Sequence, residues 1–213
     1  MPLSRKLYRY TKSKYAEDFV RNGNVYFNHA RTFKNGNLTL AQQDNERIRS
    51  FNFEDAQQKP SLFDQHGRCL QLLQMDVFLT NGNLTPRDYF MLCWATEPID
   101  RLYDEFDAEV CIQLKDPCEF HRRILNEIKA KFKVGGRYAA WDVKYFDPQL
   151  PPIVDDFLDY QFLKARQYSN QREFRMVLEV CHTSATQDNL VVKVGCLNDI
   201  CRIYERGEKI ADP

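Results

Sequence analysis

Strand-like segments recur along this chain and outnumber the helical ones. Short runs rich in β-branched and aromatic residues are typical of strands. Such runs occur at 7–10, 25–27, 70–80, 89–95, 108–114, 138–146, 174–180, 190–194 and 200–204. They do not alternate regularly with helices, as strands do in a doubly wound parallel sheet. The pattern therefore predicts an α+β fold in which a mixed or antiparallel sheet forms the core and a few helices pack against it.

The segment between the first two strands carries the signals of a helix. Thr11 and Ser13 are candidate N-caps, because their hydroxyls can accept from free amides of a first turn. The apolar residues with helical spacing are Tyr15, Phe19 and Val20. Gly23 follows them in the position where a left-handed residue commonly closes a helix. The chain is therefore expected to open as strand, helix, strand.

Two further helices are expected in the second half of the chain. Asp116 and Pro117 start the clearer one, since proline is favoured in a first helical turn. Its apolar residues recur at intervals of three and four: Phe120, Ile124, Leu125, Ile128 and Phe132. The other is predicted from Ile153 to about Ala165, after the break at Pro151 and Pro152.

The chain is expected to form a single domain over residues 1–213. No Pro/Gly/Ser-rich linker divides it, and 43% hydrophobic residues are enough for one large core. Residues 35–60 are polar, with few periodic apolar positions, so we expect an exposed excursion that is a candidate lid. The seven cysteines are an odd number and most lie in apolar runs, which favours buried thiols over a disulfide framework.

Charge and hydropathy limit the partners. The chain has 30 basic and 30 acidic residues and so lacks the broad positive field of nonspecific nucleic-acid binding. No apolar stretch has the length of a signal sequence or a membrane span, so a cytoplasmic protein without a membrane partner is expected. Residues 97–109 are acidic and residues 122–144 are mostly basic. These segments are read as solvated faces, with a docking patch as the alternative.

Several common catalytic motifs are missing. The sequence contains no phosphate-binding Gly-rich loop, no Gly-x-Ser-x-Gly elbow and no His-Glu-x-x-His segment. Cys118-x-x-His121 and Cys196-x4-Cys201 are isolated pairs, so no metal site is predicted. Cys93 lies in an apolar run and is read as a core residue rather than a nucleophile.

The segment 164–180 stands out because polar and charged residues crowd the start of an apolar strand. Gln171 and Glu173 are two residues apart, so their side chains would point to the same face of that strand and could line a cleft. The simpler alternative is that Glu173 is an edge carboxylate paired with Arg172 or Arg175.

Gln171-x-Glu173 resembles the Gln-x-Glu signature of one branch of the ADP-ribosyltransferases, which break the nicotinamide–ribose bond of NAD and transfer ADP-ribose. The opening strand, helix and strand resemble the start of that fold, where a basic residue contacts NAD. Residues 89–96 occupy the chain position of the family's Ser-Thr-Ser strand, although only Thr96 carries a comparable hydroxyl. From Leu7 to about Tyr204, the layout is also similar to a poorly characterised bacterial and phage domain family. Its marks are a Leu-Tyr-Lys-Tyr-like first strand and a late Lys...Gln-x-Glu-x-Arg segment.

These resemblances imply an ADP-ribosyltransferase-like fold, with NAD as substrate and a protein or nucleic acid as acceptor, in a toxin or phage-conflict effector. Glu173 would stabilise the positive charge that develops on the ribose, and Gln171 would orient the acceptor or the ribose. Arg9 would pair with a phosphate or the ribose. The remaining residues of the implied NAD site are Tyr10, Tyr26 and Phe27, which would wall the nicotinamide, with Thr96, Lys164 and Arg175.

Two other readings stay open. The first is a noncatalytic domain on the same scaffold that binds a nucleotide or a protein, because Cys93 and Ala95 stand where the transferases have hydroxyl residues. The second is a metal-dependent nuclease or other hydrolase in which Glu173 acts with further carboxylates. The candidates for those carboxylates are Asp142, Asp155 and Asp156.

Overall fold

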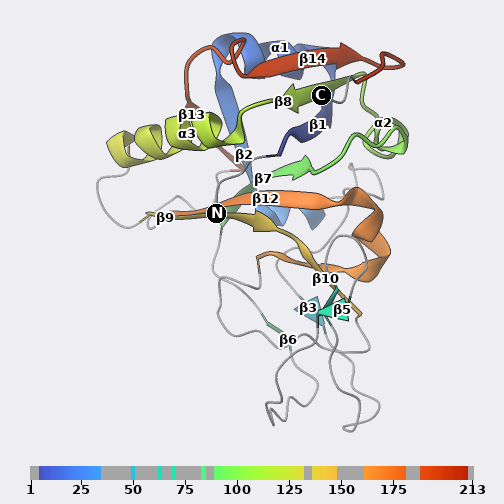
Figure 1. The fold of residues 1–213 in the computed structure, drawn as a ribbon. Helices are drawn as coiled ribbons and strands as arrows, with labels where there is room; N and C mark the ends of the chain where they lie inside the picture. Colours follow the sequence, from blue (N-terminus) through green and yellow to red (C-terminus); the bar gives the residue numbers. More distant parts are fainter. Residues whose placement is uncertain are drawn as a thin grey trace, which may run out of the picture.

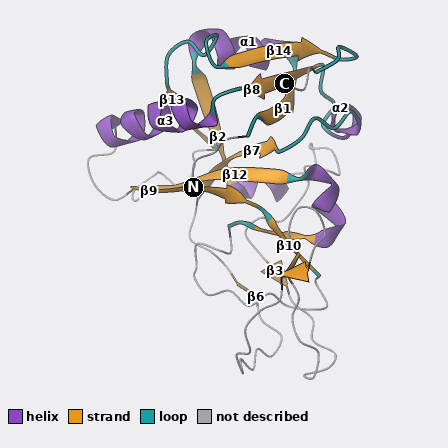
Figure 2. Ribbon diagram, in the orientation of Figure 1, coloured by secondary structure: helices purple, strands orange, loops and turns teal. Residues whose placement is uncertain are grey.

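The computed structural model describes residues 5–34, 89–131, 136–147, 161–180 and 188–210, together with four two-residue strands between 49 and 84. These residues form an eight-stranded, mostly antiparallel sheet with a few helices packed against it (Figures 1 and 2). The predicted α+β class with an antiparallel sheet is therefore confirmed.

The large sheet has one central strand, β7 (Phe90–Ala95). The other strands are β1 (Leu7–Thr11), β2 (Asn24–His29), β8 (Val110–Leu114), β9 (Gly136–Asp142), β12 (Glu173–Val180), β13 (Asn189–Lys193) and β14 (Cys201–Glu205). One edge of β7 pairs with β12, which in turn pairs with β9. The other edge meets both β1 and β2, and these lead on to β8 with β14 and to β13 respectively.

The sheet opens along this second edge of β7. Among the described residues, β1 pairs with β7 at Tyr8 and Ala95 alone, whereas β2 pairs with it at Met91 and Phe90. The middle of β7 therefore pairs with β12 along one edge. Along the other edge it faces a gap between β1 and β2. The gap lies between these two short pairings, whereas β1 keeps continuous register with β8 over its whole length.

Two helices cover one face of the sheet and build the main core. They are α1 (Ser13–Asn22) and α3 (Pro117–Lys131). Phe19 of α1 and Phe120 of α3 both pack edge-on against Trp94 of β7 and are tilted against each other, with ring centroids 5.7–5.8 Å apart. Such aromatic pairs add to the free energy gained by burying the rings. This cluster anchors β7, and with it one wall of the gap.

Helix α1 differs from its sequence prediction at its start. Neither Thr11 nor Ser13 caps it: the N-cap position is Lys12, which makes no side-chain cap bond. The carboxylate of Glu109 instead accepts hydrogen bonds from the amide and the hydroxyl of Ser13, at 3.0 and 2.9 Å. Tyr15 is 57% exposed, because it lies about 90° around the helix from the centre of the face that packs on the sheet.

The end of α1 and the start of α3 follow the sequence signals. Gly23 adopts the left-handed conformation, with φ 65°, and closes α1 as predicted. A side chain there would also collide with the backbone of Gly195, because an added Cβ would lie 1.9 Å from its carbonyl oxygen. In α3 the carboxylate of Asp116 accepts from the amide of Glu119 at 2.9 Å, as expected of an N-cap.

The predicted helix over 153–165 is wrong at its end. Residues Leu163–Ala165 form strand β11, which runs parallel to β10 (Lys144–Phe146) with Lys164 opposite Tyr145. Pairing with β10 holds this segment extended and overrides its helical spacing. A 3-10 helix, η2 (Arg166–Gln171), then leads into β12. Residues 153–160 lie outside the described residues.

Smaller elements complete the described fold. They are η1 (Ala30–Lys34), β3 (Arg49–Ser50), β4 (Leu62–Phe63), β5 (Cys69–Leu70), β6 (Asn83–Leu84) and α2 (Arg101–Glu105). Strands β11, β10, β4 and β5 form a second sheet, and β3 pairs with β6. Apart from β3, the candidate lid at 35–60 lies outside the described residues, as does the predicted strand 70–80 beyond Leu70.

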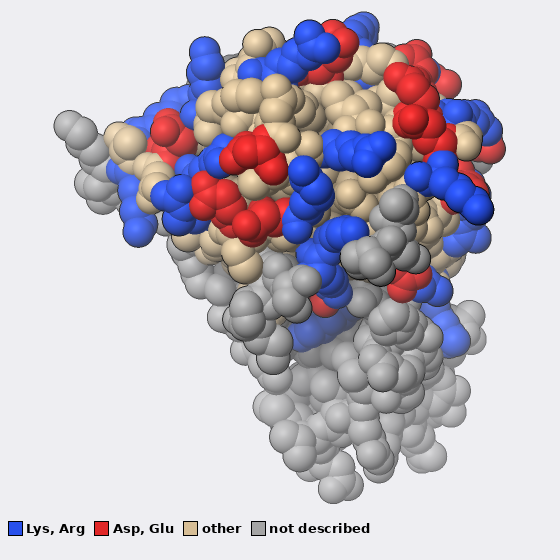
Figure 3. Space-filling view, turned by 45° about the horizontal axis from the view of Figure 1, so that its top comes forward, with Lys and Arg blue, Asp and Glu red and all other residues tan. Residues whose placement is uncertain are grey.

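The described surface carries mixed charge. Figure 3 shows Lys and Arg side chains interspersed with Asp and Glu over the face in view. In the acidic segment 97–109, Asp104 pairs with Arg206 and Asp107 pairs with Lys12. These acidic residues thus form ion pairs within the chain, as expected if the segment is a solvated face. No helix in the described part of the chain is long and apolar enough to cross a membrane.

Candidate functional site

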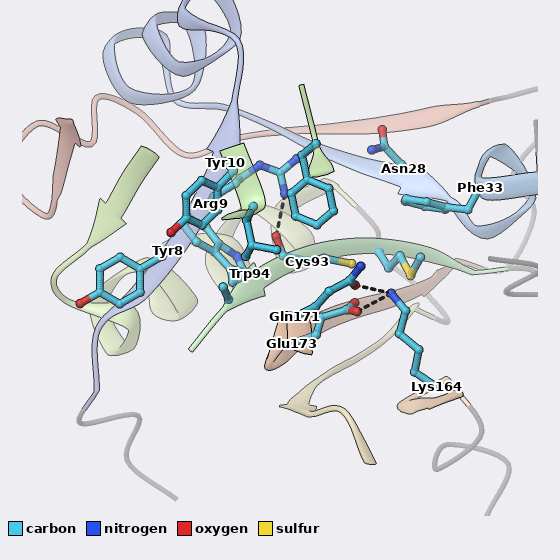
Figure 4. Close-up of a pocket in the computed structure, with 14 residues that line it drawn as sticks. Tyr8, Arg9, Tyr10, Asn28, Phe33, Cys93, Trp94, Lys164, Gln171 and Glu173 are labelled. Carbon is cyan, nitrogen blue, oxygen red and sulfur yellow. Dashed lines mark hydrogen bonds and ion pairs between the residues drawn. The ribbon is translucent and has the colours of Figure 1, made fainter. Parts of the chain in front are cut away.

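A cavity of about 150 Å³ lies at the gap in the sheet (Figure 4). It takes its walls from β1, the end of β2, η1, β7, the α2 region, β11 and the η2–β12 junction. The described residues that line it are Tyr8, Arg9, Tyr10, Asn28, Phe33, Met91, Cys93, Trp94, Ala95, Leu102, Phe106, Lys164, Gln171 and Glu173. Apolar and aromatic side chains thus surround a small set of polar groups, the usual composition of a small-molecule site.

Arg9 lies where β1 and β7 part. Its Nη1 donates a hydrogen bond to the Cys93 carbonyl at 2.8 Å, as the dashed line in Figure 4 shows. In an antiparallel strand, alternate residues direct their backbone groups to the same edge. Met91 pairs with β2 and Ala95 pairs with β1, so Cys93 between them points its carbonyl into the gap, where Arg9 satisfies it. No carboxylate within the described ranges pairs with this guanidinium, which keeps further donors for a ligand.

Glu173 forms the centre of a buried charged cluster. Its side chain is 6% exposed. Arg175 Nε donates to Glu173 Oε1 at 2.5 Å, and Lys164 Nζ donates to Oε2 at 2.8 Å. The same ammonium donates to Gln171 Oε1 at 2.8 Å. Arg175 also donates to the Gln161 carbonyl at 2.8 Å, so each side chain of the cluster is held by at least one hydrogen bond.

The cluster fixes the ionisation of Glu173. Burial alone raises the pKa of a carboxyl, but the charges of Arg175 and Lys164 together outweigh burial and hold the pKa of Glu173 well below its usual range. Glu173 is therefore a carboxylate at neutral pH. The pKa of the Cys93 thiol is raised, by burial first and by the neighbouring Glu173 charge second. Cys93 is therefore a thiol, which argues against its use as a nucleophile.

Backbone contacts set the position at which β12 begins. The hydroxyl of Tyr145 accepts from the Glu173 amide at 2.9 Å, and the carbonyl of Glu173 accepts from the Val143 amide at 2.9 Å. Arg172, between Gln171 and Glu173, has φ 44°, which a non-glycine residue rarely adopts. This left-handed residue turns the end of η2 into β12, so that Gln171 and Glu173 both face the cavity.

The structure brings together five of the nine residues implied by the sequence: Arg9, Tyr10, Lys164, Gln171 and Glu173 all line the cavity. Arg175 lies behind Glu173 and is linked to the cavity only by its hydrogen bond to that carboxylate in the described contacts. Thr96 is buried just beyond β7, where its amide donates to the Arg172 carbonyl at 2.9 Å. Its hydroxyl is not part of the cavity wall formed by the described residues.

Tyr26 and Phe27 are not placed in the cavity, contrary to expectation. Phe27 is fully buried in the main core beneath the helices, because its side chain lies on the face of β2 that points to the core. Tyr26 is 38% exposed, and its hydroxyl donates to the Asp18 carboxylate at 3.0 Å. The aromatic wall comes from other parts of the chain instead. Its described members are Tyr8, Tyr10, Phe33, Trp94 and Phe106.

Sequence reasoning missed most of this apolar wall. Asn28 and Phe33 come from the end of β2 and from η1, and Leu102 and Phe106 come from the α2 region. Nothing in their spacing links these residues, because only the topology of the sheet brings them together. Cys93 was read as a core residue, but it is half-buried and faces the cavity.

The described residues contain no metal-binding cluster of three or more His, Cys, Asp or Glu side chains. Asp142, one candidate metal ligand, forms an ion pair with Arg5. Asp155 and Asp156 lie outside the described residues. No observation at the cavity therefore favours the metal-dependent hydrolase.

Three comparisons tested whether known proteins share this arrangement. No protein-family model, no curated protein and no solved structure matches the chain. The geometry of the cavity and the residue patterns of the sequence therefore remain as the indications of function.

Proposed function

We propose that the cavity binds NAD and that the protein is an ADP-ribosyltransferase-like enzyme acting on a protein or nucleic acid, as a toxin or phage-conflict effector would. One observation carries the proposal: Arg9, Tyr10, Gln171 and Glu173 come from opposite ends of the chain and meet at one cavity. The resemblance to the ADP-ribosyltransferases implied all four as parts of one NAD site. An unrelated surface pattern would have no reason to converge in this way.

The chemistry requires few groups. Breaking the bond between ribose and nicotinamide builds positive charge on the ribose ring, which an ionised carboxylate in a buried site stabilises. Glu173 is buried, ionised and at the cavity wall. The remaining donors of Arg9 suit a phosphate or ribose oxygen, because a planar guanidinium can give several hydrogen bonds at once. Tyr8, Tyr10 and the other aromatic residues would pack against the nicotinamide ring.

The cavity suits one end of NAD rather than the whole molecule. Its volume of about 150 Å³ is below the roughly 300–1,000 Å³ of typical ligand pockets. We therefore assign it to the nicotinamide ribose, the part at which the bond breaks. The adenosine half would extend past Arg9 and out of the cavity.

A second candidate is a noncatalytic nucleotide-binding protein on the same scaffold. It is favoured by the state of Glu173, both of whose oxygens already accept hydrogen bonds from cations. The two positive charges weaken the field that this carboxylate presents to a developing ribosyl cation. On this reading the cavity holds a nucleotide through Arg9 and the aromatic wall and does not cleave it.

The deciding experiment incubates the purified protein with labelled NAD and a cell lysate and measures both released nicotinamide and label on macromolecules. The matched variants are Glu173→Gln and Glu179→Gln, because Glu179 lies on the same strand at its far end and bonds to Gln161. A transferase labels an acceptor in the wild type and in Glu179→Gln but not in Glu173→Gln.

Binding of NAD without nicotinamide release would support the noncatalytic candidate instead. Turnover that is unchanged in Glu173→Gln would show that this carboxylate does not carry the reaction. Absence of NAD binding, measured by calorimetry on the same preparations, would refute the transferase, and absence of binding to any nucleotide would refute both candidates. Circular dichroism of each variant separates a failure to fold from a failure to bind.

A further inference from the structure

Lys164 occupies an unusual place for a lysine. It lies on β11, in the second sheet, and is 6% exposed. Its Nζ donates to Gln171 Oε1 and to Glu173 Oε2, both at 2.8 Å, and lies 5.1 Å from the centre of the Tyr168 ring. Figure 4 shows the ammonium facing the ends of both side chains, with a dashed line to each. Burying an ammonium is costly unless it is paired and hydrogen-bonded, so this geometry is strongly determined.

We propose that Lys164 is a positioning residue that sets the orientation of the Gln171 amide and of the Glu173 carboxylate for the ligand. This inference rests on the proposed function, because it assigns a role within the same NAD site. Lys164 is not assigned to the ligand itself. Its ammonium acts through the two side chains that it holds.

The orientation of Gln171 follows from the donor character of lysine. An ammonium only donates, so it must face the amide oxygen of Gln171 and not the amide nitrogen. The nitrogen, with its two donors, is thereby directed away from Lys164. Lys164 therefore favours the orientation in which the Gln171 oxygen faces the charged cluster and its nitrogen faces away from the ammonium.

Arg175 and Lys164 have different tasks at Glu173. Arg175 lies two residues along the same strand, has a fully buried side chain and is itself held by the Gln161 carbonyl. It keeps Glu173 paired even when Lys164 is absent. Lys164 comes from another sheet, and it alone of the two cations is bonded to both Gln171 and Glu173 in the described contacts. Loss of Lys164 should therefore disturb the site more than the fold.

Four charged or titratable groups surround Glu173, and a test must separate their effects on its pKa. They are Lys164 on β11, Arg175 on β12, the Cys93 thiol on β7 and the Tyr145 hydroxyl on β10. The thiol and the phenol are neutral near pH 7, because burial raises the pKa of each. The two cations are therefore the groups whose removal raises the pKa of Glu173.

The test compares the wild type with Lys164→Met, Lys164→Arg and the surface control Lys193→Met, which lies at the end of β13. Glutamate carboxyl and glutamine side-chain amide resonances are followed by NMR across pH, with Glu173→Gln and Gln171→Ala identifying the signals. We expect Lys164→Met to raise the titration midpoint of Glu173 and to shift the Gln171 amide signals. Lys164→Arg should keep the midpoint near the wild-type value, and Lys193→Met should change neither signal.

NAD kinetics then test the role in the site. We expect Lys164→Met to lower kcat about tenfold or more, as for the loss of one charge-assisted hydrogen bond, with a smaller change in KM. Lys164→Arg should recover part of kcat. Unchanged Glu173 and Gln171 signals in a folded Lys164→Met protein, or unchanged kinetics, would overturn the inference. A wild type without NAD turnover would refute the proposed function, while the NMR result would still decide whether Lys164 orients the two side chains.

Discussion

Replacing Arg175 with methionine should destabilise the protein severely. The Arg175 side chain is fully buried and donates to Glu173 and to the Gln161 carbonyl. Methionine keeps much of the packing but leaves a buried carboxylate with Lys164 as its remaining cation. Removing one partner of a buried ion pair typically costs about 3–5 kcal/mol, because the other charge stays buried. Since domains are stable by only about 5–15 kcal/mol, this loss is a large fraction of the whole.

Equilibrium unfolding in urea, followed by circular dichroism, measures this loss. With a urea dependence of about 2–3 kcal/mol per molar, the midpoint should fall by about 1–2.5 M. The matched control is Arg206→Met, which breaks an ion pair with Asp104 whose side chains are 54% and 71% exposed. Exposed pairs of this kind contribute about 0–1 kcal/mol, so the control should move the midpoint little.

A double variant tests the stated cause. If the cost in Arg175→Met comes from a buried carboxylate that has lost one of its two cations, then adding Glu173→Gln should remove part of it. The two substitutions should therefore cost less together than the sum of their separate costs, by about 1 kcal/mol or more. A loss in Arg175→Met no larger than that in Arg206→Met, or strict additivity with Glu173→Gln, would refute the reasoning that this cluster is a dry, coupled network.

Three further predictions use the same unfolding measurement. Gly23→Ala should cost more than Gly207→Ala: both residues have positive φ, but only at Gly23 would the added Cβ meet the Gly195 backbone, and equal costs would contradict this. Asp116→Ala should cost about 1 kcal/mol through loss of the α3 cap, whereas Asp116→Asn should cost less. The lowered pKa of Glu173 contributes stability above the ordinary pKa of 4.5 that is lost as pH falls through the folded value, so the advantage of the wild type over Glu173→Gln should shrink below about pH 4.5. A pH-independent difference would contradict that assignment.

The local signals of the sequence predicted the fold well wherever one segment determines its own structure. Gly23 closes α1 and Asp116 opens α3, because each acts on a backbone group within a few residues. The run of aromatic, β-branched and other apolar residues within 174–180 identified β12 for the same reason. Leu163–Ala165 was misread as helix because its partner, β10, lies about twenty residues away and leaves no trace in the local pattern. Ser13 was misread as a cap for a similar reason, since its partner Glu109 comes from a distant segment.

The candidate site was predictable in its polar half and not in its apolar half. Gln171 and Glu173 both line the cavity, as predicted from their two-residue spacing, although the left-handed turn at Arg172 directs Gln171 there and strand alternation does not, because Gln171 ends η2. Phe33 and Phe106 reach the cavity only because β1 and β2 meet the same edge of β7 at different ends. A two-residue spacing can be read from sequence, whereas the place at which a sheet opens depends on how every strand pairs.

The two halves of the site also differ in how they are built. From Lys164 to Arg175 the chain forms β11, turns through η2 and enters β12, so that residues close in sequence bond to one another around Glu173. This unit can hold a carboxylate ionised but cannot enclose a ligand. Arg9 and the aromatic wall come from the other side of the gap. There the middle of β7 faces no paired strand in the described fold, and the Cys93 carbonyl accepts from Arg9 instead. The gap therefore does two things at once: it frees the backbone that positions Arg9, and it makes room for a ligand between Arg9 and Glu173. A substitution that closed the gap should abolish ligand binding even with every residue of the charged cluster intact.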